Sequence, residues 1–174
     1  MPRSGGPFHE AALRKDVDEF EQLAKSGVDA DSPNSAGRLP LHTFCSAPWM
    51  HDEFLLDNQV PRPATQWLLE HTNDINTPDR DGIAALHLAS MMSPYLVKEL
   101  LAAGADPTRS TCDGMNALHL AAHARQSNIV GMLTDALTIQ NEKLQEDQVM
   151  PRITLRERRR TTLVVLVALR LCLT

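Results

Sequence analysis

The sequence predicts an all-α solenoid, a stack of short helix-turn-helix units that is followed by a C-terminal tail. Three observations predict it: one phrase that repeats at a constant offset, a second phrase that follows it in a fixed order, and a core poor in aromatic residues. Of the 174 residues, 43% are apolar but only 4% are aromatic. Leu, Ala, Val, Ile and Met must therefore form the core, and such a core suits thin, closely stacked helices.

The first phrase marks the start of a unit. Residues 81–89, DGIAALHLA, recur at 113–121 as DGMNALHLA, with an offset of 32 residues at every position. Shorter copies lie at 37–42 and 7–12. Repetition at a fixed period of this length indicates stacked structural units.

The second phrase closes a unit. LLAAGAD at 100–106 matches LAKSGVD at 23–29, and LLEHTNDIN at 68–76 is the same phrase with Thr72 in place of glycine. Gly104 fits a left-handed helix end, a conformation without steric penalty only in glycine. Helices are expected at 85–92 and 94–102, and turns, here called fingers, at 79–82 and 110–114. Helices this short are marginal alone, so neighbouring units must stabilise one another.

With these phrases the chain resembles the ankyrin-repeat proteins over residues 7–137. That family's repeat runs from a glycine turn through a Thr-Pro-Leu-His helix start to a second helix that ends in Leu-Leu and Gly-Ala-Asp. Several positions depart from it and weaken helix capping, namely Gly6, Leu39, Ala84-Ala85 and Asn116-Ala117. The buried anchors are kept as Leu41, Leu86 and Leu118. The resemblance implies about four units, two of them irregular, at 7–33, 34–78, 79–110 and 111–137.

Two segments fall outside the repeat. The second unit contains an insertion at 47–62, which either covers the flank of its own repeat or forms a binding loop anchored by Trp49 and Phe54. The tail, residues 138–174, is polar, then Arg-rich, then apolar over 163–173. That apolar run is shorter than the ~20 residues that span a bilayer. Four interpretations of the tail stay open: packing against the last repeat, a nuclear-import signal at 156–160, a membrane-surface helix, and an incidental end.

No catalytic residue, metal site or cofactor is predicted. The histidines that share one repeat position are expected to be hydrogen-bonding elements of the turns: His9, His42, His87 and His119. His119 and His123 have metal-ligand spacing, but the glutamate of the zinc-protease pattern is missing. Cys112, on a finger, has no partner histidine or basic group that would mark a nucleophile. The sequence therefore does not predict an enzyme.

Charge and cysteine usage favour a soluble intracellular protein. The net charge is −5 and no basic cluster precedes the tail, so a nucleic-acid partner is not expected. Cys45, Cys112 and Cys172 are widely spaced, which is typical of reduced thiols. Residues 1–6 do not resemble a signal peptide. We expect a cytoplasmic or nuclear monomer that does not depend on a membrane.

The resemblance also implies a working surface, because partners of ankyrin-repeat proteins usually contact the fingers and the concave face of the first helices. Carried over by position, that surface comprises Arg38, Ser46, Ala47, Arg80, Asp81, Ile83, Met91, Met92, Cys112, Asp113, Met115, His123 and Ala124. The fold is not expected to bury its four large apolar members, which are predicted to form a binding patch: Ile83, Met91, Met92 and Met115. The expected function is an adaptor or scaffold that binds a partner protein. The alternatives are an I-kappa-B-like inhibitor that masks a transcription factor, and a non-catalytic accessory component of an enzyme or pathway.

Overall fold

A computed structural model of the chain describes residues 6–14, 16–47 and 62–147. The two predicted insertion anchors, Trp49 and Phe54, lie outside the described residues. The Arg-rich and apolar parts of the tail lie outside them as well.

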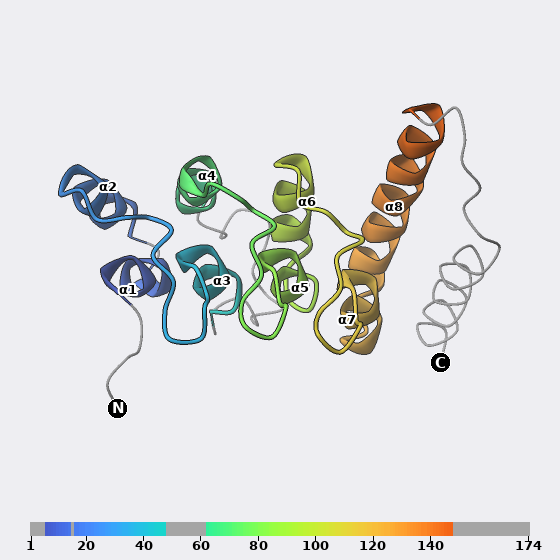
Figure 1. Cartoon of the computed structure of the whole chain (residues 1–174), viewed down its shortest axis with the longest axis horizontal. Helices are drawn as coiled ribbons and strands as arrows, with labels where there is room; N and C mark the ends of the chain where they lie inside the picture. Colours follow the sequence, from blue (N-terminus) through green and yellow to red (C-terminus); the bar gives the residue numbers. More distant parts are fainter. Residues whose placement is uncertain (1–5, 15, 48–61, 148–174) are drawn as a thin grey trace.

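The described residues form helices in four consecutive pairs. The first helices of the pairs are α1 (Pro7–Arg14), α3 (Pro40–Cys45), α5 (Ala85–Ala89) and α7 (Ala117–His123). The second helices are α2 (Val17–Lys25), α4 (Arg62–His71), α6 (Pro94–Ala102) and α8 (Ser127–Asp147). Figure 1 shows the first helices in one layer and the second helices in another, with the fingers reaching beyond the first layer. The predicted all-α repeat solenoid is confirmed. The four helix pairs are called units 1 to 4, in chain order.

One helix boundary differs from its prediction. Helix α6 has the expected bounds, but α5 ends at Ala89 rather than at residue 92. The cause is the start of α6, where the Ser93 side chain accepts a hydrogen bond from the N–H of Leu96. Pro94 disfavours helical backbone at Ser93, whose φ of −140° and ψ of 113° are extended. Residues 90–92 therefore form a turn instead of a further helical turn.

Helix α8 is longer than any other described helix and extends past residue 137. It has 21 residues and runs to Asp147, into the segment that the sequence assigns to the tail. Leu137 is buried at 6% exposure, whereas Ile139 is 54% exposed. Among the side chains that the structure describes, Leu137 is the last of α8 that belongs to the core, and the helix itself continues beyond it.

One continuous core joins all four units. The predicted anchors Leu41, Leu86 and Leu118 are 2%, 3% and 1% exposed. At the amino-terminal end, Phe8 and Phe20 are fully buried and stack at a centroid distance of 6.2 Å. The units therefore share their buried surface, as short helices that are unstable alone require.

The first helices begin with the weak caps that the sequence predicts, except in unit 4. Leu39 and Ala84 have no side-chain cap, whereas the Asn116 side chain accepts a hydrogen bond from the N–H of His119 at 3.1 Å. In units 2 and 3 the repeat histidine compensates in part, because its Nδ1 atom accepts the N–H of the capping residue. The distances are 3.1 Å for Leu39 and 3.0 Å for Ala84. These histidines are thus part of the helix start.

Candidate protein-binding surface

Three fingers of the same geometry connect the units. They comprise residues 34–38, 79–83 and 111–115, and are called fingers 1, 2 and 3. Each is closed by a pair of backbone hydrogen bonds, in finger 2 from Asp79 to Ile83 at 2.9 Å and from Gly82 to Asp79 at 3.0 Å. The glycine of each finger has a φ of 76° or 77°, which favours glycine. The predicted turn positions are confirmed, and the shape of each finger depends on residues within the finger.

Neighbouring fingers are also bonded to each other. The N–H of Arg80 donates to the carbonyl of Ala36 at 3.2 Å, and the N–H of Cys112 donates to the carbonyl of Asp81 at 3.0 Å. A Cβ atom added to Gly82 would lie 2.8 Å from the backbone nitrogen of Cys112. Only glycine permits this approach, so the fingers form one continuous row of fixed spacing.

An ion pair at the base of the row holds fingers 1 and 2 together. The Arg38 Nε atom donates to Asp79 Oδ2 at 3.0 Å, and the Asp79 side chain is 1% exposed. The other oxygen of Asp79 accepts the N–H groups of Asp81 and Ile83, each at 2.9 Å. Burial alone would raise the pKa of Asp79, but these hydrogen bonds and the guanidinium outweigh it and the pKa is lowered. Arg38 therefore has a structural role in addition to any contact with a partner.

Five other polar members of the predicted surface are exposed, whereas Ser46 is half-buried and its hydroxyl donates to the carbonyl of Thr43 at 3.2 Å. The exposed side chains are those of Arg80, Asp81, Cys112, Asp113 and His123. Except for His123, which ends α7, they all lie on fingers 2 and 3. The finger row thus presents a mixed set of charges next to a thiol.

The apolar part of the predicted surface needs correction. Ile83, Met91 and Met92 are half-buried and pack against the core, so the fold does use them. Met115 differs, with 39% of its surface exposed. Ala47, carried over as a surface residue, is 1% exposed. The burial of residues 83, 91 and 92 cannot be predicted from the repeat phrase, because it depends on how neighbouring elements pack against them.

The repeat histidines link consecutive units. Their Nε2 atoms lie close to a backbone carbonyl in the segment that leads to the next unit: His9 to Ser32 at 3.1 Å, His42 to Ile83 at 3.0 Å, and His87 to Arg109 at 3.0 Å. Burial disfavours the charged ring and lowers the pKa of all three, although the carbonyl contacts partly oppose the shift. The predicted hydrogen-bonding role is confirmed for these three residues.

The potential metal-ligating side chains are scattered over the described part of the chain. Within it, no group of three or more His, Cys, Asp or Glu side chains is placed to hold a metal ion. Burial raises the pKa of the Cys45 thiol to about 12, which makes that thiol unreactive. None of the helices in the described ranges is long and apolar enough to cross a membrane.

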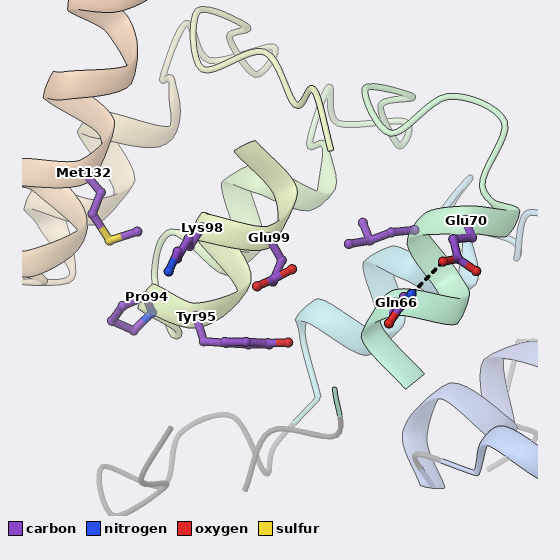
Figure 2. Close-up of a pocket in the computed structure, with 8 residues that line it drawn as sticks. Gln66, Glu70, Pro94, Tyr95, Lys98, Glu99 and Met132 are labelled. Atoms are coloured by element: carbon purple, nitrogen blue, oxygen red, sulfur yellow. Dashed lines mark hydrogen bonds between the residues drawn. The ribbon is translucent and has the colours of Figure 1, made fainter. Parts of the chain in front are cut away.

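A groove that the sequence did not predict lies on the layer of the second helices. It has a volume of about 530 Å³ and is lined by Gln66, Leu69, Glu70, Pro94, Tyr95, Lys98, Glu99 and Met132. In Figure 2, Tyr95 and Glu99 on α6 lie across from Gln66 and Glu70 on α4, whose side chains share a 2.8 Å hydrogen bond. These residues come from three units and follow no motif, so no signal in the sequence pointed to the groove. None of the predicted site residues lines it.

The comparison with protein families agrees with this architecture. A family model described as ankyrin repeats (3 copies) matches residues 8–106 and 57–143. The two matches together span residues 8–143, which contain α2 to α7 entirely and most of α1 and α8.

Proposed function

Because the chain belongs to the ankyrin-repeat family, whose repeats generally mediate protein–protein interaction, we propose that it is an adaptor or scaffold. It binds a partner protein through fingers 2 and 3 and the adjoining first helices. The coarser role, a protein-interaction module, is the property of the family. The finer one, an adaptor that uses this particular surface, is our proposal.

The observation that carries the proposal is the bonded finger row. The contacts from Arg80 to Ala36 and from Cys112 to Asp81 use backbone atoms alone, so they leave the exposed side chains of fingers 2 and 3 free to meet a partner. A surface that is rigid before binding loses little conformational freedom when the complex forms. Polar side chains on such a row supply specificity, because each wrong partner leaves a charge unpaired.

The test is a pair of charge-swap variants that do not alter the net charge. Arg80→Glu with Asp113→Lys changes exposed residues of the finger row, whereas Lys98→Glu with Glu99→Lys changes the groove on the other layer. Tagged wild-type and variant chains are expressed in cells, and captured proteins are quantified by mass spectrometry. We expect the finger variant to lose specific partners at least tenfold, a change of about 1.4 kcal/mol, and the groove variant to keep them.

The opposite pattern, with loss only in the groove variant, would show that the second-helix layer is the binding surface and would refute the proposal. Circular dichroism on both variants checks that helicity is unchanged. Met91 is unsuited to this test because it packs against the core. An inhibitor that masks a transcription factor and an accessory component of an enzyme would use the same surface, and the identity of the captured proteins separates those roles from an adaptor.

A further inference from the structure

The outer edge of unit 4 repeats the groups that join units inside the array. At each internal joint, a histidine of one unit contacts the segment that leads to the next unit. At the two joints that connect units 2, 3 and 4, the finger of one unit also bonds to the finger of the next. Unit 4 has the same histidine and the same finger, but α8 continues to Asp147 without a further finger. This edge therefore has the form of an internal joint.

His119 is the first sign of an open joint. Its Nδ1 atom contacts the start of α7, 2.6 Å from Oδ1 of Asn116 and 3.3 Å from the backbone nitrogen of the same residue. Its Nε2 atom, however, has no hydrogen-bond partner within the described ranges, whereas that of His87 reaches the carbonyl of Arg109. His87 is 2% exposed, and His119 at the same repeat position is half-buried.

Finger 3, like His119, lacks among the described residues a bonding partner that its equivalents inside the array have. The carbonyls of Ala36 and Asp81 each accept an N–H from the next finger, and Asp113 is at the equivalent position of finger 3. Among the described residues no group bonds to its carbonyl, and none lies within 4 Å of a Cβ atom added to Gly114. The last finger therefore offers a backbone acceptor beside open space.

Apolar surface accompanies these polar groups. Leu88 in unit 3 is 7% exposed, whereas Leu120, its equivalent in the terminal unit 4, is half-buried. Met115, on finger 3 of the same unit, is 39% exposed. Repeat arrays generally need a terminal cap because such a surface otherwise favours aggregation.

We propose that the apolar segment 163–173 of this chain docks on the outer edge of unit 4 and serves as its cap. Its sequence, LVVLVALRLCL, supplies the apolar side chains that Met115 and Leu120 lack as neighbours. The six arginines after residue 147 also complement the acidic array, since Asp113 and Asp135 on unit 4 are exposed and form no ion pair in the described part.

The connection is long enough for this docking. Helix α8 has 21 residues, so it is about 32 Å long at 1.5 Å per residue. In Figure 1 it starts beside α7 and ends on the side away from the fingers. Residues 148–162 can span at most about 50 Å when extended. Segment 163–173 can therefore return along the whole of α8 and reach the edge of unit 4.

The cysteines of the chain provide a direct test. Cys112 is exposed on finger 3, Cys172 lies in the proposed cap, and Cys45 is fully buried. The full-length protein is treated at low concentration with a short bismaleimide, and the products are digested and identified by mass spectrometry. We expect one dominant product in which Cys112 and Cys172 of the same molecule are joined.

A matched pair of surface variants shows where the segment docks. Met115→Asp changes the edge, and Leu13→Asp changes a leucine of similar exposure, 37% against 39%, in unit 1 at the other end of the array. We expect Met115→Asp to lower the yield of the intramolecular product several-fold and Leu13→Asp to leave it unchanged. A product that joins two molecules would assign the edge to a second copy of the chain and overturn the proposal. It is equally overturned by the absence of this cross-link or by a yield that Met115→Asp does not alter.

Discussion

The Nε2 atom of His87 lies 3.0 Å from the carbonyl oxygen of Arg109, and its Nδ1 atom lies 3.0 Å from the backbone nitrogen of Ala84. Because Nδ1 accepts the N–H of Ala84, the ring proton must be on Nε2, where it is donated to the carbonyl. A charged ring would carry a second proton on Nδ1, and this proton would point at the N–H of Ala84, which is also a donor. The joint between units 3 and 4 therefore requires a neutral ring, and His42 meets the same requirement between Leu39 and Ile83.

We expect the stability of the array to fall when the pH drops below 6.5. The pKa values of His9, His42 and His87 are lowered from 6.5, chiefly because burial disfavours the charged ring. The unfolded chain then binds more protons than the native chain below pH 6.5, so acid favours unfolding. This contribution is fully present above pH 6.5 and is lost as the pH falls toward the folded pKa values. Each histidine can remove at most about 1.4 kcal/mol per pH unit.

Urea denaturation at pH 7.5, 6.5 and 5.5 measures this effect. The variant His87→Gln removes one linked proton, so its free energy of unfolding should depend less on pH than that of the wild type. His123→Gln, at an exposed position of α7, serves as the control and should keep the wild-type slope. A wild-type stability that stays constant between pH 7.5 and 5.5 would contradict the proposed linkage.

Replacing Asp79 by alanine should destabilise the array strongly. The substitution leaves the half-buried Arg38 guanidinium without its partner and leaves the N–H groups of Asp81 and Ile83 without an acceptor. Loss of one partner of a buried pair costs about 3 to 5 kcal/mol. Asp81→Ala removes an exposed carboxylate on the same finger and should change stability by less than about 0.5 kcal/mol. Equal losses in the two variants, measured by urea denaturation, would show that the ion pair contributes nothing.

The sequence predicted those features that local chemistry determines. Gly104 and Gly82 adopt the positive φ that their turns require, and α6 begins at Pro94 and ends at Ala102 as expected. These features depend on neighbours in the chain, which a single repeat contains. Features that arise only when units stack could not be predicted, because they depend on which residues of different units meet.

Ile83 illustrates this limit. By its position in the finger it was expected to be free for a partner, yet it packs against the core, and its carbonyl lies 3.0 Å from Nε2 of His42 in the preceding unit. The groove between α4 and α6 has the same origin, since Tyr95 and Gln66 belong to different units. The repeat phrase defines the helices and the fingers, but the pairing between units selects which side chains remain on the surface.

The amino-terminal unit should depend on a stack of aromatic rings. Trp67 on α4 lies 5.0 Å from Phe20 and 5.8 Å from Phe8, measured between ring centroids. Trp67→Ala removes the contact that joins unit 2 to these two rings and should cost about 3 kcal/mol. Because repeat arrays transmit stability mainly to neighbours, hydrogen exchange should accelerate in α1 and α2 and remain unchanged in α7. Gln66→Ala, at the adjacent exposed position, is the control, and uniform acceleration along the array would contradict this local effect.

Gly82→Ala should reveal the strength of the bond between fingers 2 and 3. Gly82 and Gly27 have φ values of 76° and 77°, so alanine at either position carries the same left-handed penalty of about 1 to 2 kcal/mol. Their surroundings differ: a Cβ atom at Gly82 would lie 2.8 Å from the backbone nitrogen of Cys112, whereas nothing described lies within 4 Å at Gly27. Backbone atoms cannot move aside as a flexible side chain does, so Gly82→Ala must also separate the fingers. We expect it to lower the free energy of unfolding by about 1 to 3 kcal/mol more than Gly27→Ala does. Equal losses in the two variants would mean that finger 3 can shift freely, and a rigid finger row would then be excluded.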